Sequence, residues 1–446
     1  MPLTVSDMNA LLRRATHRVW HSRFARNVAI VASGTAGAQA ITIAFAPIIT
    51  RLYGPEAFGL LGTFMAILAI AAPIAALTYP IAIVLPKDDR DAMGLVRLSI
   101  FLSFGMALLA SVLLLMGGDW LTTTLGAESV NGYLLLIPVA MLFGAWLQIV
   151  HQWLIRKKQF GVIARSAIAH SLIVNSAKSG IGWFHPVGAV LIVLATLGNA
   201  LHAALLFIGA RNRDQAESDK IEAGPSTTLK ALAYQHRDFP LYRAPQIFIN
   251  AVSHSLPVLM LAAFFGSAAA GFYTLARMVM AMPSTLIGKA VNDVFYPRIT
   301  EAAHNGENLT QHILRATGAL LAIGMVPFGL VVLFGPWLFG LVFGHEWVMA
   351  GEYARWLSLW LLAAFINQPS VATIPVLSLQ RGFLVYEITS VIARVSAIVL
   401  GVYLFQSDVV AIALFAVVGV ALNLFLIAWV FRIAYGLENA REDEQA

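Results

Sequence analysis

The sequence predicts an all-α, polytopic membrane protein: twelve transmembrane helices in two pseudo-symmetric six-helix lobes around a central cavity. First, the chain of 446 residues is 59% hydrophobic and only 12% charged, whereas soluble domains are about 45–50% apolar and about 25% charged. Second, most of its apolar runs reach about 20 residues, the length that a helix needs to cross a bilayer. Third, a pattern of glycine, proline and basic residues occurs twice, once in each half of the chain.

The apolar runs give the predicted spans and, from them, the predicted domains. The spans are expected at 27–50, 58–85, 95–116, 133–154, 161–183, 187–209, 240–264, 270–296, 313–335, 353–378, 383–405 and 408–431. The polar segment 211–239 carries Gly224-Pro225 and mixed charge, which is typical of a linker. The domains are therefore a basic cytoplasmic N-terminal arm, an N-lobe (spans 1–6), a cytoplasmic linker, a C-lobe (spans 7–12) and a cytoplasmic tail, at 1–26, 27–210, 211–239, 240–433 and 434–446.

The N-terminal arm carries five arginines and is not expected to be a cleavable signal peptide, because no small-residue cleavage site follows a short apolar core. Two interpretations stay open. Its apolar residues either face lipid headgroups on a basic surface helix, or the segment is a partly ordered cytoplasmic arm.

Lysines and arginines predict the orientation. If the chain has twelve spans, nearly all lysines and arginines outside the spans fall on one side of the membrane. Arg51 is the exception. The opposite loops, which hold no Lys or Arg, are 117–132, 184–186, 265–269, 336–352 and 406–407. Because positive loops stay in the cytoplasm, both termini are expected there. Four tryptophans near the outer ends of spans are typical of an aromatic belt: Trp120, Trp183, Trp337 and Trp347.

The internal repeat has an offset of about 212 residues. In each copy two glycines lie five apart between two spans, a proline falls inside the next span, and a proline followed by a basic residue ends it. The first copy is Gly54, Gly59, Pro73, Pro86 and Lys87; the second is Gly266, Gly271, Pro283, Pro297 and Arg298. Since each copy has six spans, both start inside, and the repeat is parallel with its pseudo-two-fold axis along the membrane normal, as in some secondary transporters.

Cations inside the spans are the main candidates for a binding site, because intramembrane charge is costly and marks functional sites by default. Arg394 lies near the middle of span 11, Arg277 and Lys289 flank the midpoint of span 8, and Lys178 lies in span 5. They outnumber the clear anions, Asp293 and Glu387. A net-positive cavity suits an anionic passenger such as a phosphate or pyrophosphate, which arginine can bind in a bidentate way.

Structural roles remain an alternative for these residues. Lys289 and Asp293 are i,i+4 on one helix face and can pair, and Glu387 and Arg394, seven apart, can share one network. Arg51 lies at the outer mouth, either as an interfacial anchor paired with Glu56 or as a contact for a departing anion.

Polar uncharged residues add a second group. Gln246, Asn250 and His254 form one stripe of span 7, and Asn367 lies in span 10. Such groups either join helices or contact substrate. His254 is either a titrating group or a structural histidine.

Soluble-enzyme motifs are absent from the sequence. There is no cysteine, which excludes disulfides and thiolate chemistry. The Gly54-x4-Gly59 spacing lacks the Lys-Ser/Thr of a phosphate-binding loop, and no metalloprotease or dinucleotide-binding motif occurs. The basic residues follow membrane sidedness, so no metal, no cofactor and no nucleic-acid partner is expected.

Two stretches resemble a known family: TRLYGPEAFGLLGTFMAI with LPKDDRD within 27–97, and FGSAAAGFYTLARMVMAMPSTL at 265–286. They are similar to the polysaccharide and oligosaccharide (O-antigen or exopolysaccharide) flippases of the multidrug/oligosaccharidyl-lipid/polysaccharide (MOP) exporter superfamily. The resemblance implies a non-enzymatic flippase in the bacterial inner membrane. It would move undecaprenyl-pyrophosphate-linked oligosaccharide by alternating access.

The resemblance also implies roles and partners. The cavity cations would hold the pyrophosphate while the lipid tail stays in the bilayer. Coupling to H⁺ or Na⁺ would involve Glu387, Asp293 or His254. Partners would be the lipid-linked oligosaccharide, membrane lipid and polysaccharide polymerase or assembly proteins.

Two other functions compete with this one. A cation-coupled multidrug (MATE-like) antiporter would share the scaffold, but span 1 lacks the acidic residue that such antiporters typically carry. A membrane glycosyltransferase or polymerase would need a sizeable external domain, whereas the longest external segments here, 117–132 and 336–352, are short and hold no Lys or Arg.

Overall fold

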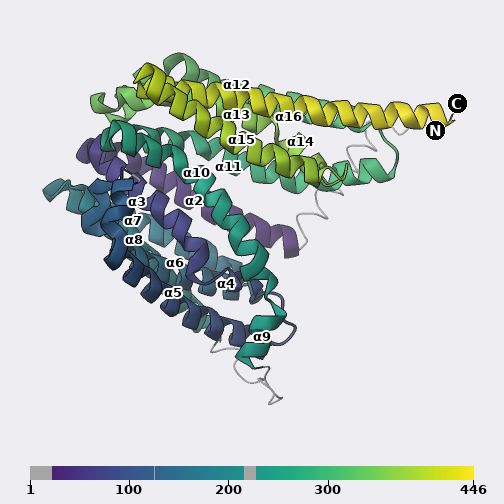
Figure 1. Cartoon of the computed structure of the whole chain (residues 1–446). Coiled ribbons are helices and arrows are strands. Elements are labelled where there is room, and N and C mark those ends of the chain that lie inside the picture. The colour runs from purple at the N-terminus through teal and green to yellow at the C-terminus, as the bar shows by residue number, and fades with distance from the viewer. Residues whose placement is uncertain (1–22, 125, 215–227, 446) are drawn as a thin grey trace. The chain divides into compact units, whose positions relative to one another are not determined.

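A computed structural model describes residues 23–124, 126–214 and 228–445; the side chains of 23–28, 212–214, 282–294 and 440–445 are outside the described part. The predictions for the arm 1–22, much of the linker 211–239, and the side chains of Lys289 and Asp293 therefore lie outside the described residues. Within the described part the regular elements are all helices, which confirms the predicted all-α class (Figure 1).

The helices follow the predicted spans closely. In chain order the α-helices are α2 (Arg23–Leu52), α3 (Pro55–Ala75), α4 (Tyr79–Ala82), α5 (Asp89–Thr124), α6 (Leu136–Arg156), α7 (Phe160–Phe184), α8 (Gly188–Asp214), α9 (Leu229–Gln235), α10 (Ala244–Phe265), α11 (Ser267–His304), α12 (Leu309–Phe343), α13 (Val348–Ile366), α14 (Gln368–Thr373), α15 (Gln380–Leu400) and α16 (Asp408–Gln445). Short 3₁₀ or π segments are η1 (Glu128–Tyr133), η2 (Phe239–Arg243), η3 (His345–Trp347) and η4 (Gly401–Phe405).

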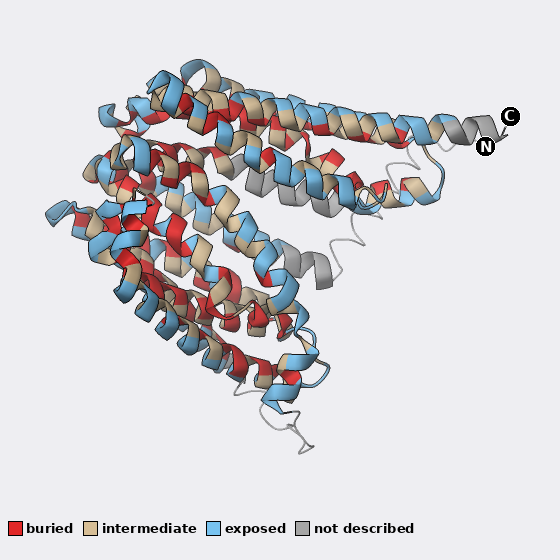
Figure 2. Cartoon of the chain, in the orientation of Figure 1, coloured by how far each residue is buried: buried red, intermediate tan, exposed pale blue. Residues whose placement is uncertain are grey.

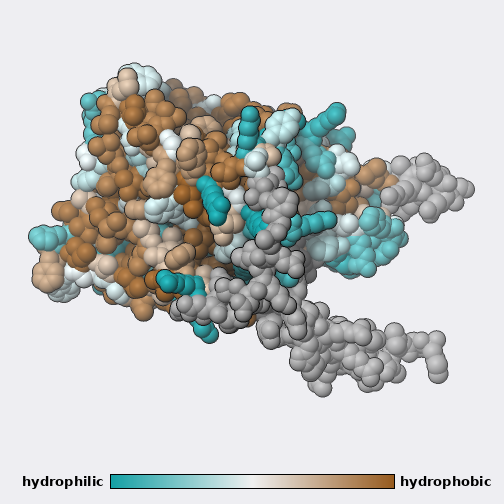
Figure 3. All heavy atoms as spheres, turned by 90° about the horizontal axis from the view of Figure 1, so that it is seen from below, coloured by the Kyte–Doolittle hydropathy of each residue, from teal (hydrophilic) through white to brown (hydrophobic). Residues whose placement is uncertain are grey.

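The protein is a multi-pass membrane protein. Ten helices of the described part are long and apolar enough to cross a membrane. Of two further helices, α11 covers predicted span 8, whereas predicted span 10 (353–378) is divided between α13 and the short α14, so the set is roughly consistent with twelve spans. Many large apolar side chains are exposed on these helices. Exposed residues are pale blue in Figure 2, and hydrophobic residues dominate the left of the face in Figure 3. In water such a surface would be unfavourable, whereas lipid solvates it.

Contacts divide the chain into two compact units. Unit 1 holds residues 1–52, 67–118 and 132–251, and unit 2 holds 53–66, 119–131 and 252–446. Each unit thus gathers segments that are distant in the sequence. The predicted lobe boundaries, 27–210 and 240–433, remain a prediction.

In unit 1, α2 and α7 approach closely because small residues face each other. A Cβ built on Gly34 would lie 2.4 Å from the Cβ of Ala164, so only glycine fits there. Two turns further on, the hydroxyls of Thr42 and Ser171 are 3.0 Å apart, and Ser171 donates to the carbonyl of Ala38 at 2.8 Å. Small residues and hydroxyl pairs of this kind are how helices associate in lipid.

The connection before α5 in unit 1 is held by one arginine of α6. Arg156 Nε binds Asp89 Oδ1 at 2.9 Å, and its Nη atoms donate to the carbonyls of Pro86 at 2.5 Å and Lys87 at 3.1 Å. Lys157 pairs with the same carboxylate. The LPKDDRD stretch is therefore fixed by charge-assisted hydrogen bonds.

In unit 2, α3 and α11 cross at glycines of the sequence repeat. A Cβ on Gly59 would lie 1.7 Å from the carbonyl oxygen of Ser267, and one on Gly271 would lie 1.9 Å from that of Pro55. Ser267 and Gly271 are each 212 residues after Pro55 and Gly59, so the two contacts are equivalent under the repeat. A self-complementary contact of this kind is what a two-fold axis generates.

Two features of the outer connections can be compared with the sequence. Pro55 begins α3, where its missing N–H has no helical partner to lose. Trp120, Trp183 and Trp337 are 71%, 74% and 64% exposed, whereas Trp347 is only 1% exposed. The belt position predicted for Trp347 is wrong, because its ring packs edge-on against Phe58 at 5.0 Å and Phe272 at 6.2 Å.

The arginine clamp predicts a stability change. Arg156→Ala should lower the free energy of unfolding by about 2 kcal/mol, because it leaves the carbonyls of Pro86 and Lys87 without their charged donor and leaves Asp89 paired with Lys157 alone. Thermal unfolding in detergent, followed by loss of the monodisperse chromatographic peak, measures the effect. Arg165→Ala on exposed α7 surface is the control. Equal unfolding temperatures for the two variants would contradict the role of the clamp.

The close crossing of α3 and α11 at Gly271 predicts a second loss of stability, measured against a matched glycine variant. Gly271→Ala should destabilise the protein by about 1–3 kcal/mol, because the added methyl meets backbone that cannot rotate away. Gly105→Ala on α5 is the matched control, since nothing lies within 4 Å of a Cβ at that position. The same thermal assay compares them. Stability of Gly271→Ala at or above the wild-type value would show that the helices separate easily.

Candidate functional site

Three of the four predicted cavity cations, Arg277, Lys289 and Arg394, lie in unit 2. Arg277 is held between α10 and α11. Arg277 Nη1 donates to the backbone carbonyl of His254, and its side chain also hydrogen-bonds to Tyr273. Tyr273 lies about one turn earlier on α11 and is buried. These contacts orient the Arg277 guanidinium without neutralising its charge.

The second cation, Arg394 of α15, lies against aromatic rings. Its guanidinium carbon is 5.5 Å from the ring centre of Trp360 and 5.9 Å from that of Phe415, within cation–π range. The two rings meet edge-on at 5.0 Å. Gly419 makes room for Trp360, because a Cβ there would lie 2.4 Å from its Cδ1.

These residues form a cationic cluster, defined here as His254, Arg277 and Arg394. Arg277 and Arg394 act electrostatically on each other and on His254. No described carboxylate forms an ion pair with either arginine. Arg355 of α13 differs, because it pairs with Glu352 at 3.0 Å. The cluster therefore carries positive charge that described residues do not neutralise, which favours an anion.

Hydrogen-bond donors in the cluster are also left available. Arg394 uses Nε for the carbonyl of Ser390 at 3.2 Å, and no described residue accepts from its two Nη atoms. A guanidinium edge with free Nη donors can bind two oxygens of one phosphate group.

The predicted anions stand at different places. Glu387 is exposed on α15 and acts electrostatically on Arg394, but no ion pair joins the two among the described side chains. Lys289 and Asp293 lie on α11, whose backbone is described there, while their side chains are outside the described residues. Their predicted pairing stays a prediction.

Lys178 and Arg51 belong to unit 1. Lys178 is half-buried on α7, where its charge acts on His170. Arg51 is exposed in the last turn of α2. Neither is among the residues that the structure brings together around Arg394 within unit 2.

The polar candidates divide into exposed and buried. Gln246, Asn250 and His254 are all exposed on α10, and Gln246 Oε1 accepts from Arg243 at 2.8 Å. Asn367 is only 3% exposed and donates to Asn423 Oδ1 at 2.9 Å. These polar groups were expected either to join helices or to contact substrate. The Asn367 amide joins helices.

Sequence reasoning missed the aromatic part of the site. Trp360 and Phe415 lie on α13 and α16, far from Arg394 in the chain, and Tyr273 is one turn from Arg277 on α11. An aromatic residue within an apolar span has no distinguishing local pattern. Only helix packing places these rings against the arginines.

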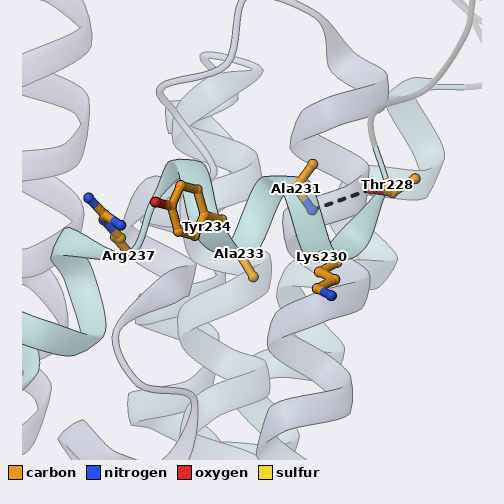
Figure 4. A pocket seen from close by; sticks show the side chains of 6 residues that line it. All are labelled: Thr228, Lys230, Ala231, Ala233, Tyr234 and Arg237. Carbon is orange, nitrogen blue, oxygen red and sulfur yellow. Dashed lines mark hydrogen bonds between the residues drawn. The ribbon is translucent and has the colours of Figure 1, made fainter.

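A surface pocket of about 600 Å³ lies elsewhere, on α9 (Figure 4). Its lining residues are Thr228, Lys230, Ala231, Ala233, Tyr234 and Arg237. Thr228 Oγ1 caps the helix by accepting from Ala231 N at 3.3 Å, and Arg237 stacks on Tyr234 at 4.4 Å. None of the predicted site residues lines this pocket. Within the described residues no group of His, Asp or Glu forms a metal site.

Known proteins place the chain in a family. Residues 48–352 match the model of the family described as "Polysaccharide biosynthesis protein". The succinoglycan biosynthesis transport protein ExoT of Rhizobium meliloti (strain 1021) is 25% identical over 338 residues. That match covers 74% of this chain and 63% of the relative, so the chain spans less than two thirds of the relative's length.

Solved structures give the fold. An inward-facing MATE family transporter of the MOP superfamily matches with a TM-score of 0.63 at 15% identity, covering 93% of this chain and 98% of that one. The lipid II flippase MurJ in an inward closed conformation matches with a TM-score of 0.67 at 12% identity, covering 89% and 86%. The chain belongs to the polysaccharide biosynthesis protein family, and its fold is that of MOP-superfamily transporters.

Proposed function

We propose that this protein is a flippase that moves undecaprenyl-pyrophosphate-linked oligosaccharide across the bacterial inner membrane and performs no covalent chemistry itself. The observation that carries the proposal is the cationic cluster, in which two arginines within the predicted spans form no ion pair with a described carboxylate, although Glu387 acts electrostatically on Arg394. Family membership and the printed transport function of the succinoglycan relative support the same class of cargo. Loops rich in Lys and Arg support cytoplasmic termini.

The chemistry of the cluster fits a pyrophosphate. Arg394 offers two Nη atoms, and the rings of Trp360 and Phe415 hold its guanidinium in place. Arg277 adds a second positive charge nearby. In a low-dielectric surrounding these charges attract an anion far more strongly than in water. Within unit 2, Lys289 is proposed as a further cation for the cargo. In unit 1, Lys178 is proposed as a separate cation, and Asn250 and Gln246 as polar contacts for sugar hydroxyls.

Alternating access would use the helix crossing in unit 2. The contact of Gly59 with Ser267 and of Gly271 with Pro55 joins the outer ends of spans 2 and 8 of the two proposed lobes. We propose that this contact closes the outer side in one state and separates when cargo leaves.

Substitution of the central arginine tests the cargo assignment. Arg394→Ala should abolish export, with lipid-linked oligosaccharide accumulating in the membrane, because the anion loses its bidentate partner. Arg394→Lys should restore export only partly, since an ammonium is a point charge. Polysaccharide on the cell surface and extracted lipid-linked oligosaccharide are measured in a deletion strain at matched protein levels.

The control for this test is Arg355→Ala, which removes an arginine that is already paired with Glu352. Its export should remain when its folded protein level matches the wild type. Wild-type export by Arg394→Ala at equal membrane abundance would overturn the assignment of the cluster.

A disulfide crosslink tests the proposed closure. Because the chain contains no cysteine, an introduced pair is its only possible disulfide. A Cβ on Gly62 would lie 3.1 Å from Thr274 Cβ, close to the spacing of about 3.8 Å in disulfides. Gly62→Cys with Thr274→Cys should crosslink on oxidation and stop export, and reduction should restore it. Each single variant is the control. Full export by the completely crosslinked protein would show that the helices need not separate.

A further inference from the structure

A short helix outside the predicted spans carries exposed cations that the proposed function does not use. This helix, α9, is fixed to other helices of unit 1. Its Leu232 is only 1% exposed and lies in one buried cluster with Ala92 and Leu95 of α5. The hydroxyl of Tyr79 donates to the carbonyl of Ala233 at 3.0 Å. These contacts hold α9 at the start of α5 (Figure 1).

The same packing places α9 at the depth of the membrane surface. A Cβ built on Gly94 would lie 2.4 Å from Leu232 Cδ1, and Gly94 immediately precedes predicted span 3. The segment η2 follows α9, and its Phe239 carbonyl accepts from Thr78 Oγ1 at 3.0 Å, just before predicted span 7. The segment 228–243 thus lies where apolar spans begin. Lysines and arginines gather on this side of the membrane, which is expected to be cytoplasmic.

One face of α9 points away from this packing. Lys230, Tyr234 and Arg237 follow an i, i+4, i+7 spacing, which places them on one helical face. All three are exposed, and Tyr234 is 68% exposed. The Arg237 guanidinium lies 4.4 Å from the ring centre of Tyr234, and Figure 4 shows that ring between the two cations. The face therefore presents an aromatic ring flanked by two positive charges.

The two cations of this face keep their charge and their donors. Neither Lys230 nor Arg237 forms an ion pair with a described carboxylate, and no described residue accepts a hydrogen bond from either side chain. Asp238 is exposed beside Arg237, and Asp91 of α5 acts electrostatically on His236. Lysine and arginine donors of this kind bind phosphate oxygens.

The pocket on α9 combines these donors with apolar surface. It measures about 600 Å³, and Lys230 and Arg237 line it together with Ala231, Ala233 and Tyr234. A small soluble anion would use only the donors. A phospholipid brings both a phosphate and apolar carbons, so it matches the whole lining.

Exposed apolar residues beside the pocket also favour lipid. Leu241 and Tyr242 of η2 are 59% and 73% exposed. Tyrosine is enriched at the membrane–water boundary, and surface-lying segments pair basic residues with aromatic and leucine side chains. The segment 228–243 has this composition at this depth.

We propose that the α9 surface, defined as Lys230, Tyr234 and Arg237, binds the headgroup of an anionic phospholipid in the leaflet on the basic side of the membrane. The two cations bind phosphate oxygens, and the Tyr234 ring packs against the glycerol carbons. Charge complementarity carries the assignment, because a leaflet that contains anionic lipid attracts basic residues at its surface. This binding is separate from cargo recognition and does not depend on the cationic cluster.

A fluorescence-quenching experiment tests the proposal on the full chain in nanodiscs. Ala231→Cys introduces the only cysteine of the chain, at an exposed position that lines the pocket, and it is labelled with bimane. The nanodiscs contain equal amounts of phosphatidylglycerol and phosphatidylcholine. In each sample one of the two lipids carries bromine near the headgroup end of its acyl chains. Brominated phosphatidylglycerol should quench the bimane more strongly than brominated phosphatidylcholine.

Charge-removing variants locate the preference. Lys230→Gln with Arg237→Gln should abolish it, because each lost cation weakens binding to an anionic surface about fivefold. The matched control, Lys158→Gln with Arg165→Gln, removes the same charge from exposed positions of the same unit and should keep the wild-type preference. A monodisperse chromatographic peak confirms that each variant is folded.

Three outcomes would overturn the proposal. Equal quenching by the two brominated lipids in the labelled chain would show that the α9 surface does not select anionic lipid. Loss of the preference in the control variant would assign it to overall charge. Loss on adding inorganic phosphate, compared with chloride at equal ionic strength, would assign the pocket to a soluble anion.

The cargo is distinguished by adding undecaprenyl pyrophosphate to the same nanodiscs. The preference for phosphatidylglycerol should remain, because the proposed cargo site lies elsewhere. If the added pyrophosphate lipid removes the preference, the pocket binds cargo and the proposal is wrong. Since none of these measurements uses export, their result is independent of the Arg394→Ala test of the proposed function.

Discussion

Lipid is the solvent for most of this chain, and that one constraint decides the rest of the structure. A backbone without water must satisfy its hydrogen bonds internally, so the spanning segments are helices. The hydrophobic effect cannot drive these helices together, because lipid is as apolar as their side chains. Close packing and hydrogen bonds must hold them instead. The contacts of Gly34 with Ala164, and of Gly59 with Ser267, are the result.

The same constraint gives each intramembrane charge a meaning. Arg355 is balanced by Glu352 and the carbonyl of Val332, and such a residue stabilises the fold. Arg394 has cation–π contacts and a single hydrogen bond to a carbonyl, and it forms no ion pair with a described carboxylate. Holding a charge in this way costs free energy. The anionic cargo that we propose would supply a counter-charge for this group.

The units also show how polar chemistry is distributed. Unit 2 holds the cationic cluster, in which arginines stay charged and suit an anion. In unit 1 the rings of His170 and His202 stack, with their centres 4.6 Å apart.

The sequence by itself determined the class and the outline of the fold. Hydropathy and length depend only on local composition, so the spans at 133–154 and 161–183 correspond closely to α6 and α7. The cost of buried charge likewise identifies Arg277, His254 and Arg394 as candidates from their positions in the apolar runs. Tertiary structure decided what those residues touch. The Trp360 ring beside Arg394, the stacking of His170 on His202, and the burial of Trp347 all depend on helix rotation and crossing. These follow from packing between distant segments, and no local pattern encodes them.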